Sequence, residues 1–200
     1  MHRRPKPGCG HREPEPVAAV DDADLIRGTL AGRREDFDAL VERYQKSIYA
    51  FVYRFVHDHD QAADLVQMTF LQAYTHLGQF AGRSSFTTWL HQIALNQCRA
   101  AHRAGRAQQH VPLDDVSEAR LAAAGGSPAP DSTDPGWKPA LERQIARLPL
   151  RQRSVVTLRL FSDLPFKEIA RIERISENSA KVNYHHAITR LRQWLRENES

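Results

Sequence analysis

Apolar residues recur every three or four positions through two blocks of this chain and seldom alternate with polar ones. This spacing is the period of an amphipathic α-helix, whereas a half-buried β-strand needs strict alternation. The sequence therefore predicts an all-α protein. The predicted helices cover residues 24–32, 37–55, 62–77, 86–103, 141–148, 155–160, 165–172 and 176–195.

Changes in composition divide the chain into a tail, two helical blocks and a linker. Residues 1–20 contain four prolines and two glycines, which is typical of a disordered tail. Residues 107–137 are rich in Gly, Pro, Ser and Asp, which predicts a flexible linker. The remaining blocks, 21–106 and 138–197, are each long enough for one small helical domain. We therefore expect two small helical domains joined by a flexible linker.

Cysteine content and hydropathy limit where such a chain can reside. Cys9 and Cys98 are too few for a disulfide framework, which favours a reducing compartment. No run of about 18 apolar residues is present to cross a membrane, and no apolar run follows the basic N-terminus as a secretory signal requires. We therefore expect a cytoplasmic protein without membrane insertion.

The C-terminal block has the layout of a helix-turn-helix. A short predicted helix over 165–172 is followed by a turn of about three residues and by Ser176 as the N-cap of a long helix. The start of that helix would enter the major groove of DNA. Residues 138–200 hold 13 Lys and Arg against 7 Asp and Glu, so the basic charge is concentrated there. The simpler alternative is a helical hairpin with a solvated basic face.

A second motif lies in the first block. It comprises DQAADLVQMTFLQAY over 60–74, FAGRSSFTTWL over 80–90 and IALN over 93–96. Together with the helix-turn-helix, it resembles the conserved core of bacterial sigma-70-type sigma factors of the extracytoplasmic-function (ECF) group. The resemblance covers residues 35–106 and 138–196. It implies sigma region 2 in the first block and sigma region 4 in the second.

The resemblance also implies partners and a polymerase-binding surface. In this family a region 2 helix binds the clamp of the largest subunit of core RNA polymerase, and the flap of the second-largest subunit is a further contact. Asp64 and Gln67 share one helix face, and an acidic and amide face suits a basic partner, although it also suits plain solvation. Family members are commonly held inactive by an anti-sigma factor. The residues implied to bind polymerase are Asp60, Asp64, Gln67, Phe70 and Tyr74.

Promoter DNA is the other implied partner, with the minus-10 element recognised and melted by the first block. Aromatic faces and small hydroxyls suit capture of unstacked bases, and arginines suit phosphates. Trp89 could stack on such bases or pack in the core against Ile93, and we favour the core position. The residues implied for minus-10 binding are Ser84, Ser85, Phe86, Thr87, Trp89, Asn96, Arg99 and Arg103.

The second block is implied to read the minus-35 element as duplex. Its short or cationic side chains can reach base edges and phosphates. Asn183 and His186 stand where Arg is common in the family, and Arg174 where Gly is usual, so no promoter sequence is predicted. The residues implied for minus-35 binding are Asn178, Ser179, Lys181, Asn183, His186 and Arg190.

Two other functions stay open from the residues themselves. A free-standing helix-turn-helix regulator would explain the second block but not the motif over 60–96. A metal-dependent hydrolase would use the cluster of His57, His59 and Asp60. No nucleophile elbow or phosphate-binding glycine loop is present, so we do not expect an enzyme. The resemblance implies a promoter-specificity factor, which we expect to need neither cofactor nor metal.

Overall fold

Helices make up the regular structure of the computed structural model, which describes residues 20–108 and 137–198. No strand occurs in these two ranges, so the predicted all-α fold is confirmed. The predicted tail and most of the predicted linker lie outside the described residues. The first range forms α1 (Asp22–Leu30), α2 (Arg34–Val56), α3 (His59–Thr75), the 3-10 helix η1 (Leu77–Gln79) and α4 (Phe86–Gln108). The second range forms α5 (Trp137–Ala146), α6 (Leu150–Leu160), α7 (Phe166–Glu173) and α8 (Glu177–Asn198).

Short polar side chains set where several helices begin. The Asp58 carboxylate accepts from the backbone N–H of Gln61 at 2.7 Å and caps α3. Ser85 accepts from the N–H of Thr88 at 3.2 Å at the start of α4. Ser176 accepts from the N–H of Ser179 at 3.1 Å, which confirms the predicted cap of α8. Helix α3 ends at Thr75, two residues before the end of the helix predicted over 62–77.

The helix-turn-helix is formed by α7, a tight turn and α8. Arg174 occupies the turn in the left-handed region, with φ of 55°. The N–H of Ile175 donates to the carbonyl of Ala170 at 3.0 Å and closes the turn. This is a common helix C-cap, in which glycine usually occupies the left-handed position held here by Arg174. Ile175 is half-buried against the core.

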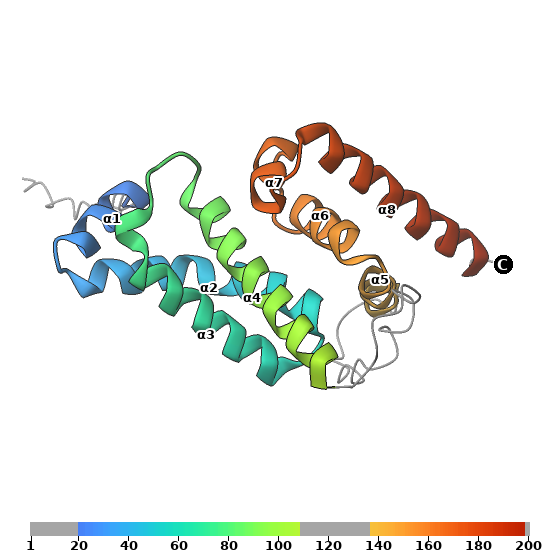
Figure 1. Ribbon diagram of the computed structural model, residues 1–200, viewed down its shortest axis with the longest axis horizontal. Coiled ribbons are helices and arrows are strands. Elements are labelled where there is room, and N and C mark those ends of the chain that lie inside the picture. Colours follow the sequence, from blue (N-terminus) through green and yellow to red (C-terminus); the bar gives the residue numbers. More distant parts are fainter. Residues whose placement is uncertain (1–19, 109–136, 199–200) are drawn as a thin grey trace, which may run out of the picture.

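The two helical groups, α1–α4 and α5–α8, pack against each other (Figure 1). Helix α4 contacts α7, and α2 contacts α5 and α6. One continuous apolar core includes Phe51 and Leu90 from the first group and Leu158 and Ile169 from the second. Periodicity predicts both groups but cannot reveal the packing between them, because that packing joins segments far apart in the sequence.

Candidate functional site

Helix α3 presents an exposed row of side chains along one face. Asp60, Asp64, Gln67, Leu71 and Tyr74 follow one another at intervals of three or four residues, and all are exposed. Leu71 is 58% exposed, the largest fraction among the exposed bulky apolar side chains of the described residues. We call these five residues the α3 stripe. It combines two acids, an amide and two apolar groups on a rigid helix.

Phe70 does not belong to the α3 stripe, contrary to expectation. Its side chain is 7% exposed and lies in the core with Ala62 and Ala73. Helical geometry explains the correction, since positions 62, 66, 70 and 73 share the inner face. Sequence reasoning overlooked Leu71, although its spacing of seven residues from Asp64 places both on one face.

The segment between α3 and α4 is built around aromatic rings. The ring of Phe80 lies 5.2 Å from Trp89 and 5.8 Å from Phe86, between centroids. Phe86 is 2% exposed and also contacts the Tyr44 ring, so it supports the loop from beneath and cannot stack on a base in this conformation. This corrects the expectation for Phe86. Trp89 is half-buried against the core, in agreement with the interpretation that we favoured.

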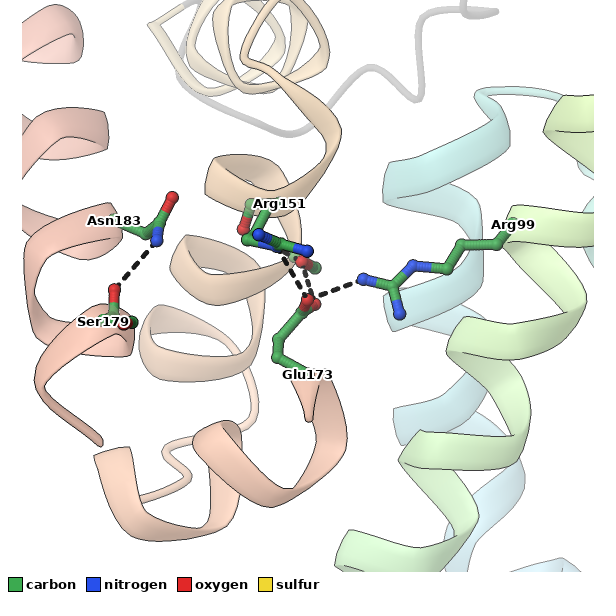
Figure 2. Close-up of polar contacts among 6 residues, drawn as sticks. Arg99, Arg151, Glu173, Ser179 and Asn183 are labelled. Carbon is green, nitrogen blue, oxygen red and sulfur yellow. Dashed lines mark hydrogen bonds and ion pairs between the residues drawn. The ribbon is translucent and has the colours of Figure 1, made fainter. Parts of the chain in front are cut away.

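The other residues implied for minus-10 binding differ in accessibility. Ser85 is occupied by the α4 cap, and Ser84 and Thr87 are half-buried. Asn96 and Arg103 are exposed, two helical turns apart on α4. Arg99 lies between them but is held by Glu173 of α7, 2.6 Å away, as Figure 2 shows.

Helix α8 exposes most of the residues implied for minus-35 binding. Asn178, Lys181, His186 and Arg190 are all exposed. Lys181 pairs with Glu177 one turn earlier at 2.8 Å, and this surface pair is open to solvent. Asn183 instead donates to the backbone carbonyl of Ser179 at 2.8 Å (Figure 2). The Ser179 hydroxyl is hydrogen-bonded to that of Ser176 at 2.8 Å, so both side chains already have local partners.

Comparison with known proteins shows which family this chain belongs to. The model of sigma-70 region 2 matches residues 40–108, and the model of sigma-70 region 4 matches residues 138–191. The chain is 32% identical over 158 residues to RNA polymerase sigma-H factor of Pseudomonas aeruginosa, covering 76% of this chain and 81% of that one. It is 27% identical to the ECF RNA polymerase sigma factor SigM of Mycobacterium tuberculosis, covering 87% of this chain and 84% of that one. The chain belongs to the sigma-70 family, in its ECF group.

A solved structure supports the fold of this sigma factor. The sigma factor RpoE of Bartonella quintana, crystallised with the anti-sigma factor NepR, aligns with a TM-score of 0.65 and 22% identity. The alignment covers 82% of this chain and 99% of that one. Members of this family are non-catalytic transcription initiation factors.

The side chains of His57, His59 and Asp60 do not gather into a group that could hold a metal ion. No group of three His, Cys, Asp or Glu side chains gathers to hold an ion within residues 20–108 and 137–198. His59 instead hydrogen-bonds through Nδ1 to the Tyr49 hydroxyl at 2.7 Å. The same ranges contain no helix with the length and apolar character needed to span a bilayer.

His91 is buried where α4 meets the second helical group. Its Nδ1 lies 2.8 Å from the carbonyl oxygen of Thr87, which can only accept, so Nδ1 carries the proton. Nε2 then accepts from the hydroxyl of Ser162, 3.1 Å away. Burial lowers the pKa of His91, since a charged ring would lose its hydration.

We expect the free energy of unfolding to decrease as the pH falls below 6.5, the ordinary pKa of histidine. Unfolded His91 binds a proton in that range while the folded form resists it, so protonation favours unfolding. Urea unfolding at about pH 8 and about pH 5.5 measures the difference. His91→Gln should reduce this difference, whereas His185→Gln, at an exposed position, should keep it. Equal decreases in the wild type and His91→Gln would contradict the assignment.

Proposed function

We propose that this sigma factor binds core RNA polymerase through its first helical group and directs initiation at promoters that both groups recognise. The observation that carries the proposal is the placement of exposed residues: the α3 stripe lies within the region 2 match, and the exposed face of α8 lies within the region 4 match. We assign region 2 to residues 21–106, the linker to 107–137 and region 4 to 138–197.

The α3 stripe is the proposed contact with the clamp of the largest polymerase subunit. Asp60 and Asp64 provide charge that attracts a basic surface and orients the complex. Leu71 and Tyr74 provide apolar area that becomes buried on docking. We assign a second contact, between the second helical group and the flap of the second-largest subunit.

DNA contacts are divided between α4 and α8. Asn96 and Arg103 are accessible on α4 for the minus-10 element, with Ser84 and Thr87 near its start. Asn178, Lys181, His186 and Arg190 are accessible on α8 for duplex DNA at minus-35, where short polar groups reach base edges and cations reach phosphates. The chain then acts as a cytoplasmic specificity subunit, with catalysis left to the polymerase.

The test is in vitro transcription with core polymerase on genomic templates, with and without this protein. Promoter-specific transcripts that require the protein would support the proposal. Their absence, together with binding of the protein alone to duplex operators, would favour the free-standing regulator instead. An anti-sigma factor is a further proposed partner. The test is to isolate a protein that co-purifies with this sigma factor, add it to the transcription reaction and measure the loss of these transcripts.

Lys181→Ala should weaken minus-35-dependent initiation and reduce the salt dependence of promoter binding by a slope of about 1, because one phosphate contact is lost. The measurement is promoter affinity of the holoenzyme across a salt series. Lys46→Ala, which removes an exposed lysine from α2, serves as the matched control and should leave the slope unchanged. An unchanged slope for Lys181→Ala would remove this residue from the phosphate contacts.

A further inference from the structure

Glu173, the last residue of α7, has a buried carboxylate that joins the two helical groups. Its side chain is fully buried. One oxygen accepts from Arg99 of α4 at 2.6 Å, and the other accepts from the hydroxyl of Ser154 on α6. Arg151 of α6 approaches the first oxygen at 3.9 Å (Figure 2). A buried charge held by charge-assisted hydrogen bonds of this kind strongly favours the arrangement that satisfies it.

Arg99 is the residue that this contact removes from solvent. Its side chain is 23% exposed, whereas Asn96 and Arg103 on either side of it are exposed. A guanidinium that is bound to Glu173 cannot at the same time bind a phosphate with the same donor. Closure of the two groups therefore hides one cation of the proposed minus-10 surface.

Helix α7 also contacts the other end of that surface. Arg171 donates to the backbone carbonyl of Arg83 at 3.0 Å, in the loop before α4. Arg171 and Glu173 thus attach one short helix both to the loop and to the middle of α4. Duplex or single-stranded DNA could not reach both places while α7 occupies them.

The rest of the contact between the groups both favours and opposes closure. The shared apolar core favours it, as do Arg54 over the Phe161 ring at 3.9 Å and the hydrogen bond from Arg153 to the carbonyl of Phe55 at 3.3 Å. Arg54 pairs with Glu142 at 3.4 Å, but its Nε and that of Arg153 are buried without a hydrogen-bond partner among the described residues. Burial lowers the pKa of both guanidiniums, which reflects the cost of desolvating them. Unsatisfied buried donors offset part of what the shared core contributes, so loss of the Glu173 charge can shift the balance toward separation of the two groups.

We propose that Glu173 acts as an intramolecular latch, which closes α7 over α4 and keeps Arg99 from nucleic acid until the two helical groups separate. The inference rests on the proposed function, because the DNA role of Arg99 belongs to that proposal. Polymerase and promoter would select the open form, and the free chain would be held in the closed one.

Spin labels on the full-length chain test the closure without polymerase or DNA. Gln72→Cys on α3 and Thr189→Cys on α8 provide exposed attachment sites, with Cys9 replaced by serine. Cys98 can remain, since burial raises the pKa of its thiol to about 12 and keeps it unreactive. The wild type should give one narrow distance distribution. Glu173→Gln retains an oxygen for Ser154 but loses the charge, and it should raise the ratio of open to closed molecules about tenfold or more.

Matched variants keep this test specific. Glu177→Gln removes an exposed carboxylate from the neighbouring helix and should leave the distances unchanged. Arg99→Gln leaves the second helical group intact, so it remains informative if Glu173→Gln unfolds, and it should open the molecule equally. The double variant should open it no further, because both changes remove the same pair. Wild-type distances in a folded Glu173→Gln or Arg99→Gln protein would overturn the latch.

Transcription at limiting sigma concentration tests the masking of Arg99. Unlabelled Glu173→Gln should give several-fold more transcript than the wild type, because less of it is closed. Longer distances with an unchanged transcript yield would overturn the masking. If no variant supports promoter-specific transcription at all, the proposed function fails, and the distances still decide whether the latch exists.

Discussion

Asp64→Arg should reduce the affinity for core RNA polymerase by at least about thirtyfold, the effect expected for a central contact residue. Asp64 is exposed in the middle of the α3 stripe, and the change places a cation against a surface that the stripe attracts by negative charge. The fold should persist, because the side chain packs against nothing in the core. Affinity is measured with labelled sigma factor and purified core enzyme.

Two further variants make the Asp64 result interpretable. Glu42→Arg reverses an exposed charge on α2, outside the α3 stripe, and should bind with nearly native affinity. Leu71→Ala removes apolar area from the α3 stripe and should weaken binding with little change in stability. If Asp64→Arg bound as tightly as Glu42→Arg, the polymerase contact would have to lie on another face.

Phe51→Ala should lower the free energy of unfolding by about 3–5 kcal/mol. Its side chain is 1% exposed, and its ring lies 5.0 Å from Phe55 and 5.1 Å from His91, between centroids. Truncation therefore removes dispersion contacts from α2 and α4 and leaves a cavity. Against a typical total stability of about 5–15 kcal/mol, this is a large fraction.

Chemical denaturation followed by circular dichroism measures the Phe51 effect. Leu71→Ala is the control, because its exposed side chain should change the free energy of unfolding by no more than about 0.5 kcal/mol. A loss below about 1 kcal/mol for Phe51→Ala would show that the neighbouring rings collapse into the space.

Local rules were enough to predict the helices and much of the surface chemistry. The period of apolar residues located the helices, and the preference for serine at helix starts located the cap at Ser176. The same rules would have separated Phe70 from the α3 stripe if each position had been assigned to a helix face. The expectation for Phe70 is wrong because the helix divides this motif between core and solvent, and Phe70 falls on the core side.

The pairing of Arg99 with Glu173 lies beyond such rules. The two residues are 74 positions apart, and each has an ordinary local explanation as a charged residue in a helix. Only the packing of α7 on α4 buries the carboxylate and makes the pair necessary. The position of Phe86 beneath its loop likewise depends on Tyr44 of α2, which no local pattern connects with it.

Because Cys98 is buried within α4, the rate at which its thiol is alkylated reports how often this helix leaves the core. Alkylating reagents attack the thiolate, and burial leaves almost none of it at neutral pH. Helix α4 must leave the core before the sulfur reacts, so the rate of alkylation at Cys98 counts how often that helix detaches. A ligand that binds and stabilises the first helical group should slow the alkylation of Cys98.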